Sequence, residues 1–298
     1  MHNAYAQRNL PSTVSPGQIE RRFQTPPAPR SSLQITPAIP KQRLAPAAAK
    51  KIHFTLRRLE IVGATVYKPE ALLPLYKKYL GRRISVADLY RIADAITVKY
   101  RNAGYILSRA FVPAQKINDG TTRIEVIEGY VDGIQYRGRP PGRDDLFAYW
   151  NRHIMQSRPL QLAVLERYLL LAGDLAGANV RSVFEPSKKH VGAATLIVIL
   201  TEKHVDLHAD LDNRGTRTLG PLQLNAGWAI NDGFGLYGRS AFNFVVTPQA
   251  AQELQYYNFT QAETLDGEGT KASLSLSYVH THPGDFLSPL DVEGRDTA

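Results

Sequence analysis

Cysteine is absent from this chain of 298 residues. The absence excludes disulfide bonds, thiolate metal sites and cysteine nucleophiles, and it is compatible with both reducing and oxidising compartments. Long apolar runs are absent as well, because no run is longer than "LIVIL", Leu196–Leu200. A transmembrane helix needs about 20 apolar residues, so the sequence offers no candidate for one.

Motifs of nucleotide-binding and hydrolytic sites are also missing. The sequence contains no G-x-S-x-G, H-E-x-x-H, P-loop or G-x-G-x-x-G pattern. His204 and His208 lie four residues apart among aspartates, which suggests a metal pair. In a strand, however, these residues share one face simply because all are even-numbered, and a water-facing surface explains them better. We therefore predict no enzyme activity, no cofactor, no metal and no small-molecule substrate.

The charge changes sign along the chain. Residues 1–53 carry eight Lys or Arg and one Asp or Glu, and residues 54–203 carry 23 and 14. Residues 204–298 reverse the balance, with 5 basic and 12 acidic residues. A uniform nucleic-acid-binding protein should not change sign in this way, and no helix-turn-helix or aromatic-laced basic motif is present. We predict no nucleic-acid partner.

The N-terminal region, residues 1–53, is expected to hold one short helix and a proline-rich linker. "MHNAYAQ" lacks the apolar core of a secretory signal, yet Ala4-Tyr5-Ala6 resembles a signal cleavage site. Either the true start lies upstream, or the match is chance. Prolines recur from Pro11 to Ala49, and only "GQIERRF" among them can form a short helix, while the rest is expected to be extended.

Residues 54–130 have the pattern of one small α+β domain. Ser85 and Asp88 form a candidate capping box, and the apolar residues after them fall on one face of a helix. Pro74 predicts that the preceding helix is kinked or starts late. An "NDG" turn joins two strands, of which the first ends at Pro113 and is therefore expected at an edge. The expected elements are a strand at 54–67, helices at 70–81 and 85–104, and strands at 106–112 and 121–131.

Residues 131–203 repeat this architecture with little residue identity. The last strand of the repeat has a continuous apolar core, which fits a buried central strand. The expected elements are a strand at 131–138, helices at 144–155 and 160–173, and strands at 178–186 and 192–203.

The helical period stops after Lys203, and strict alternation replaces it. "VDLHADLD" sets Val205, Leu207, Ala209 and Leu211 opposite Asp206, His208, Asp210 and Asp212. "LQLNAGWAIN" and "ASLSLSYV" alternate as well, and "GLYGRSAFNFVV" does so less cleanly. A soluble β-sandwich can show this pattern, and so can a membrane barrel that is apolar outside and wet inside. The alternation alone leaves both architectures open.

Two segments carry a resemblance to a known family: Gly104–Val131 ("GYILSRAFVPAQKINDGTTRIEVIEGYV") and Leu211–Pro221 ("LDNRGTRTLGP"). The chain resembles the transporters of two-partner secretion, the hemolysin activation/secretion family of outer-membrane proteins. The first segment is similar to the end of that family's first polypeptide-transport-associated (POTRA) domain, and the second to the entry into its barrel. Pro16–Phe23 ("PGQIERRF") is similar to its N-terminal plug helix.

The resemblance implies a fold class, a domain organisation and a location. The fold class is α+β followed by all-β. Residues 1–53 would hold a plug-like helix and linker, 54–130 and 131–203 two POTRA domains, and 204–298 the N-terminal part of an outer-membrane barrel. At roughly ten residues per strand, the last region supplies only the first strands, so we expect a truncated product or fragment. The location would be the outer membrane of a Gram-negative bacterium, with the POTRA domains in the periplasm.

The resemblance also implies the partners. They would be a secreted exoprotein, recognised unfolded through its N-terminal secretion domain and then translocated, and the lipid of the outer membrane. Two other functions remain open at this point: a general outer-membrane protein assembly factor, and a soluble adhesin or carbohydrate-binding protein with a β-sandwich after residue 204.

The strand expected at 106–112 is our candidate client-binding site. An open edge presents unpaired main-chain groups, to which an extended polypeptide can add as a further strand. Either Leu107 and Phe111 or Ile106 and Val112 must face the domain core, and the sequence leaves this choice open. The candidate client-binding residues are Lys99, Arg101, Leu107, Ser108, Arg109 and Phe111, and the candidate lumen-facing residues are Asp206, His208 and Asp210.

Overall fold

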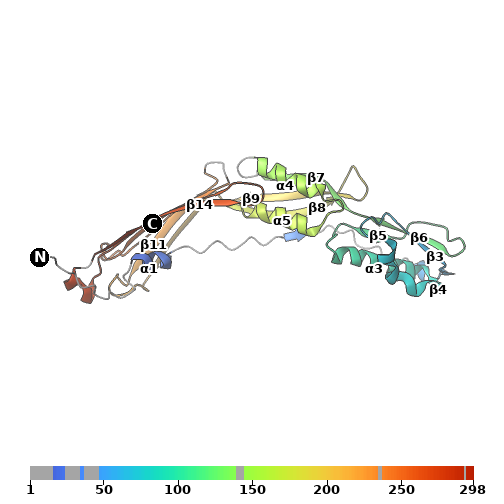
Figure 1. Cartoon of the computed structure of the whole chain (residues 1–298), viewed down its shortest axis with the longest axis horizontal. Coiled ribbons are helices and arrows are strands. Elements are labelled where there is room, and N and C mark those ends of the chain that lie inside the picture. Colours follow the sequence, from blue (N-terminus) through green and yellow to red (C-terminus); the bar gives the residue numbers. More distant parts are fainter. Residues whose placement is uncertain (1–15, 24–33, 37–46, 139–143, 234–236, 292) are drawn as a thin grey trace.

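The chain is elongated, with two α+β units in series and a large antiparallel sheet at one end (Figure 1). The computed structural model describes residues 16–23, 34–36, 47–138, 144–233, 237–291 and 293–298. The predicted fold class, α+β followed by all-β, is confirmed by the sheet topology. In the part of the chain that the structure describes, none of the helices combines the length and the apolarity needed to cross a membrane.

The first unit is a three-stranded sheet covered by helices. Its sheet has the order β3-β6-β5, with β3 and β6 parallel and β5 antiparallel to β6. The core joins the helices to the sheet through buried residues such as Leu72, Ile96 and Ile124. The elements are β2 (His53–Thr55), β3 (Arg58–Val62), α2 (Pro69–Tyr76), η3 (Lys77–Tyr79), β4 (Arg83–Ser85), α3 (Val86–Asn102), β5 (Arg109–Phe111) and β6 (Thr121–Ile127).

Three details of the first unit differ from the prediction or sharpen it. The strand expected at 54–67 is two strands: β2 pairs with β4, and β3 ends at Val62, directly before Gly63, which has a φ of +84° and lies against the Val126 carbonyl. Pro74 neither delays nor prevents α2, which begins at Pro69 and gives way to η3 after Tyr76. The predicted capping box is confirmed, because the Ser85 N–H donates to the Asp88 carboxylate at 2.7 Å.

The second unit repeats the first in topology. β7 and β9 are parallel, and β8 is antiparallel to β9, as β3, β6 and β5 are in the first unit. Its core is built around Trp150, Leu165, Phe184 and Leu196. One strand is added to this sheet: β1 (Gln34–Thr36), from the N-terminal region, pairs in parallel with β8. The other elements are β7 (Tyr130–Arg137), α4 (Asp144–Gln156), α5 (Leu162–Gly173), β8 (Ala178–Pro186) and β9 (Ala193–Glu202).

The two units are joined by main-chain hydrogen bonds and by apolar side chains. The Leu162 N–H donates to the Gly104 carbonyl at 2.8 Å, and the Leu160 N–H donates to the Gly129 carbonyl at 2.9 Å. Ile106 and Leu107 pack against the core of the second unit. The segment between α3 and β5 is therefore part of the junction between the units.

β10 to β15 form a six-stranded antiparallel sheet in which each strand pairs with the next along the chain. β13 was not predicted, because Tyr256 and Tyr257 stand side by side and break the alternation. β15 was not predicted either. The strands are β10 (Val205–Asp212), β11 (Gln223–Asn231), β12 (Arg239–Val246), β13 (Gln255–Thr264), β14 (Lys271–Thr281) and β15 (Gly294–Thr297), and η4 (Asp285–Leu290) lies between the last two.

A helix from the N-terminal region packs on this sheet, against its last two strands. The predicted short helix is confirmed as α1 (Pro16–Phe23), which contacts β14 and β15. Ile19 is buried in a cluster with Val245, Tyr256 and Val279, and the Phe23 ring centroid lies 5.7 Å from that of Tyr256. This face of the sheet is therefore covered in part by the chain's own N-terminal helix.

Candidate functional site

The predicted edge strand of the first unit is shorter than expected. Residues 106–108 form a turn and β5 covers only Arg109–Phe111, so the expected strand at 106–112 is wrong in extent. Its position at the edge of the sheet is confirmed, because among the described strands β5 pairs only with β6.

A side chain of α3 closes this edge. Thr97 is buried, its hydroxyl accepts a hydrogen bond from the Ala110 N–H at 2.9 Å, and it donates to the Ala93 carbonyl at 3.0 Å. Because main-chain groups alternate in direction along an antiparallel pair, Ala110 is the residue of β5 whose N–H points away from β6. The strand thus has no free N–H at its outer edge while α3 stays in place.

Ser108 lies inside the unit. It is 1% exposed, its N–H donates to the Tyr105 carbonyl at 3.1 Å, and its hydroxyl accepts from the Gly129 N–H at 3.2 Å. The buried face of this segment is therefore the one that carries Ser108 and Ala110. Neither pair that the sequence left open faces the first core as a pair, because Val112 packs there whereas Ile106 and Leu107 both pack against the second unit. Ser108 cannot offer its N–H to a client without breaking the turn.

The other candidate side chains are distributed around β5. Arg109 is exposed and Phe111 is half-buried. Lys99 lies on α3, where its ammonium group is 5.0 Å from the centre of the Tyr67 ring, and Arg101 is half-buried on the last turn of the same helix. Leu107 packs against the second unit instead. Of the predicted set, Arg109 and Phe111 are the side chains that the structure leaves most accessible on β5.

A carboxylate cluster that sequence reasoning missed ties the end of β6 to the loop after β3. Glu128 accepts hydrogen bonds from the Tyr100 hydroxyl at 2.7 Å, from the Val66 N–H at 2.9 Å, and from both the N–H and the hydroxyl of Thr65. Burial by itself would raise the pKa of Glu128, but these hydrogen bonds outweigh burial and hold it below its usual value. Burial and the nearby Glu128 raise the pKa of Tyr100, so its hydroxyl remains a donor.

The register of the large sheet gives it two chemically different faces. Residues directly opposite in antiparallel strands lie on the same face. One row reads Leu207, Trp228, Phe242, Phe259 and Leu276 across β10 to β14. Leu207 is 77% exposed and Leu276 is 53% exposed. One face of the sheet therefore presents a continuous apolar surface that no described part of the chain covers.

The opposite face is polar and carries α1. The row through His208 reads Gly227, Asn243, Asn258 and Ser277. The His208 Nε2 atom lies 3.0 Å from the Asn243 side-chain oxygen, and Asp206 bonds Arg239 at 2.6 Å. Asp206, His208 and Asp210 share this face with the residues that bury Ile19, while their assignment to a lumen stays a prediction.

The sheet is anchored to the second unit through the turn between β13 and β14. The Trp150 indole N–H donates to the Gly267 carbonyl at 2.7 Å, and Glu268 bonds both Tyr149 and Arg167. The hydrogen bond from Tyr149 is the main reason that the pKa of Glu268 is lowered. This turn fixes the sheet relative to α4 and α5.

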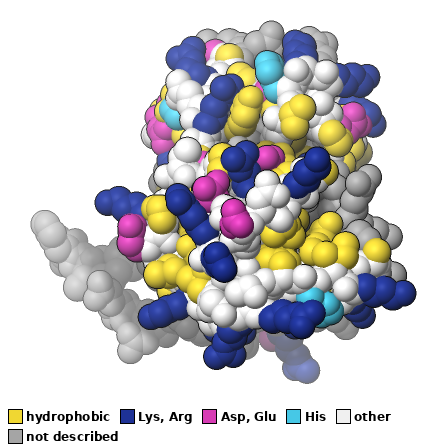
Figure 2. Space-filling model, turned by 90° about the vertical axis from the view of Figure 1, so that its right-hand side faces the viewer, with side chains coloured by type: hydrophobic (Ala, Val, Ile, Leu, Met, Phe, Trp, Pro, Cys, Tyr) yellow, Lys and Arg dark blue, Asp and Glu magenta, His cyan; other side chains and the backbone are white. Residues whose placement is uncertain are grey.

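Basic side chains dominate the molecule at the end of the first unit. Figure 2 views the chain from that end and shows Lys and Arg side chains spread over the face, with smaller acidic and hydrophobic areas between them. This distribution matches the excess of basic over acidic residues in 54–203.

Comparison with known proteins identifies the class of domain and the relatives of the chain. Residues 54–129 match the family described as POTRA domain, ShlB-type. The chain is 24% identical over 250 residues to the heme/hemopexin transporter protein HuxB of Haemophilus influenzae (strain 86-028NP), covering 83% of this chain and 44% of that protein. It is 26% identical over 248 residues to the outer membrane transporter CdiB of Escherichia coli (strain 536 / UPEC), covering 81% of this chain and 40% of that protein.

The fold has solved counterparts. The structure of CdiB from Escherichia coli matches with a TM-score of 0.60 and 23% identity over 82% of this chain and 45% of that chain. CdiB from Acinetobacter baumannii matches with a TM-score of 0.51 and 16% identity over 94% of this chain and 54% of that chain. The chain spans less than half the length of the curated relatives it matches. These findings confirm the resemblance to two-partner secretion transporters that the sequence motifs indicate.

Proposed function

We propose that this chain is part of an outer-membrane transporter of two-partner secretion, with both α+β units in the periplasm and the sheet of β10–β15 in the outer membrane. The observation that carries the proposal is the two-faced sheet. Its apolar row from Leu207 to Leu276 would contact lipid, while its polar face would line a water-filled interior that holds α1. A soluble β-sandwich would bury that row against a second sheet, and none packs on it among the described residues.

The client is proposed to be a secreted exoprotein that arrives extended and unfolded. Two tandem units that present sheet edges and basic side chains suit such a client, because main-chain pairing tolerates many sequences. At the first unit, Arg109 and Phe111 would contact the client by their side chains, whereas strand addition to β5 would require α3 to move away from Ala110. The chain moves its client without chemical catalysis.

Single cysteines offer a direct test, because the chain has none of its own. Leu207→Cys and His208→Cys are compared in outer membranes with a water-soluble maleimide, and Arg109→Cys serves as the periplasmic control. We expect labelling at residues 208 and 109 and protection at residue 207, whose side chain would lie in lipid. Labelling of residue 207, or protection of residue 208 in its place, would contradict the proposed membrane orientation.

The client is tested separately by binding. The full chain in detergent micelles is titrated with the N-terminal secretion domain of an exoprotein kept unfolded in mild urea. We expect saturable binding that weakens with salt and with Arg109→Glu, and Arg58→Glu on the opposite edge strand of the same sheet is the matched control. Absence of saturable binding to the chain would remove the exoprotein from the proposal.

A further inference from the structure

The four sheet edges of the two units differ in how much main chain they leave open. In the first unit, β5 has three residues and its outward N–H is bonded to Thr97, and β3 at the other edge has five residues. In the second unit, β8 is covered by β1, with Ile35 opposite Ser182. The fourth edge is β7, which has eight residues and, among the residues that the structure describes, pairs with β9 alone. β7 is therefore the longest strand edge left without a partner in either unit.

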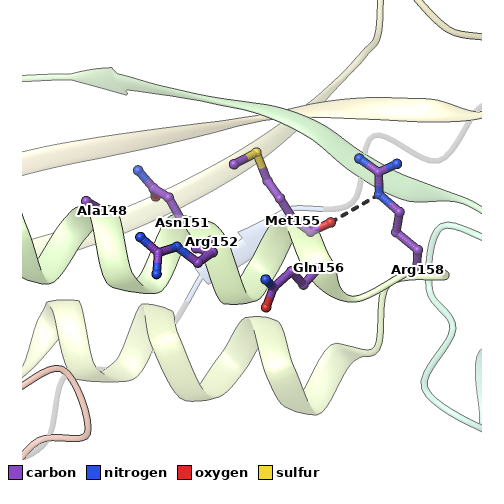
Figure 3. Close-up of a pocket in the computed structure, with 6 residues that line it drawn as sticks. All are labelled: Ala148, Asn151, Arg152, Met155, Gln156 and Arg158. Atoms are coloured by element: carbon purple, nitrogen blue, oxygen red, sulfur yellow. Dashed lines mark hydrogen bonds between the residues drawn. The ribbon is translucent and has the colours of Figure 1, made fainter.

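A hollow of about 590 Å³ lies along the flank of α4, and its lining residues come from α4 and the segment directly after it. In Figure 3, Asn151 and Met155 point from α4 toward the strands above it, and Arg158 lies beside the strand at the far end. The hollow is lined by Ala148, Asn151, Arg152, Met155, Gln156 and Arg158.

Two contacts tie this hollow to the two ends of β7. The Tyr136 hydroxyl donates to the Asn151 side-chain oxygen at 2.5 Å, and the Arg158 guanidinium lies 4.4 Å from the centre of the Tyr130 ring. Tyr130 and Tyr136 stand at opposite ends of the strand. A polypeptide that lies along β7 would therefore have α4 beside it for most of its length.

The lining has a charge of one sign. Arg152 and Arg158 are exposed, and the six lining residues include no Asp or Glu. Ala148 and Met155 add apolar surface between the polar groups. Side chains of an added strand alternate in direction, so every second residue of it would face this lining. Carboxylates at those positions complement the two guanidinium groups.

We propose that an extended, acidic segment of the client adds to the free edge of β7 and directs its carboxylates toward Arg152 and Arg158. This inference rests on the proposed function and names the groove that receives the client in the second unit. Main-chain pairing along β7 holds the segment, and the two arginines select for acidic sequence.

The probe is a fluorescent decapeptide in which Glu alternates with Val, compared with one in which Lys alternates with Val. Binding to the full chain in detergent micelles is measured by fluorescence anisotropy. We expect the Glu peptide to bind more tightly, and the Arg152→Glu/Arg158→Glu double variant to lose affinity for it by roughly tenfold or more and to prefer the Lys peptide. Hydrogen exchange should slow in residues 130–137 when the Glu peptide is present.

Two further variants keep the test independent of folding. Ala148→Trp fills the hollow without changing charge and should also weaken binding of the Glu peptide, while Arg58→Glu on β3 of the first unit should leave that binding unchanged. The proposal of a β7 groove would be contradicted by equal binding of both peptides or by no binding of either. It would also be contradicted if hydrogen exchange slowed at 109–111 or 178–186 instead of at 130–137. If the exoprotein's secretion domain still binds the chain in that case, the proposed function is retained and only the inference that the client binds along β7 is refuted.

Discussion

β9 and β10 follow each other in the chain, with only Lys203 and His204 between them, but their leucine side chains differ sharply in exposure to solvent. In β9, Leu196 is fully buried between helices and neighbouring strands, whereas Leu207 in β10 is 77% exposed. β9 is apolar over a continuous run, and β10 alternates apolar and acidic or histidine residues. The contrast shows that the protein itself covers Leu196, whereas no described part of the chain covers Leu207.

This difference should appear most strongly when one leucine of each strand is shortened. Leu196→Ala removes packing in a closed core, so it should lower the free energy of unfolding of the second unit by about 2–5 kcal/mol. Leu207→Ala is the matched control and should change that value by less than about 0.5 kcal/mol, because residue 207 contributes nothing to this core. Trp150 is the one tryptophan left in a Trp228→Phe background and lies in the core of the second unit, so its fluorescence in urea follows the unfolding of that core. Equal losses of unfolding free energy in Leu196→Ala and Leu207→Ala would contradict the difference between the two strands.

A charge on the apolar row sharpens the comparison further. Leu207→Arg should destabilise the sheet in phospholipid bilayers by about 2–4 kcal/mol if residue 207 lies near the midplane, because lipid cannot solvate the guanidinium group. His208→Arg, one residue away on the polar face, should cost much less. The readout is urea unfolding in vesicles followed by Trp228, with Trp150 replaced by Phe. A larger loss of unfolding free energy for His208→Arg than for Leu207→Arg would mean that the assignment of the two faces is reversed.

The smallest expected effect is on the stability of the first unit, where the variant changes the hydrogen bonds of Glu128 rather than an apolar surface. Glu128 has a lowered pKa when folded, so its contribution to stability is fully present above the unfolded-state value of 4.5 and is lost as pH falls through the folded-state value. Glu128→Gln should lower stability at neutral pH by about 1 kcal/mol, since it replaces a charged acceptor. It should also flatten the acid dependence of the first unit.

Hydrogen exchange of β6 between neutral pH and pH 3 measures this effect, because β6 leads directly to Glu128. Glu70→Gln, at an exposed position in α2, is the control. An unchanged acid dependence in Glu128→Gln would show that the cluster has no part in stability.

Much of the fold could be predicted from the sequence because its signals are local. The capping box at Ser85, the turns, the helical period and the strict alternation after Lys203 each act within a few residues, and they yielded both α+β units and most strands of the sheet. The candidate site was predicted less well. The strand that was expected at 106–112 is only three residues long, and Ser108 lies buried in the turn before it.

What the sequence determined by itself is the order of the units and the two faces of β10, because period and alternation are properties of neighbouring residues. Only the tertiary structure decided which edges are open. Thr97 closes β5, β1 covers β8 from about 145 residues away, and Trp150 bonds the turn at Gly267. A sheet edge is open or closed according to which segment packs beside it. Those segments are distant in the sequence, and their own sequence patterns do not indicate which edge they will cover.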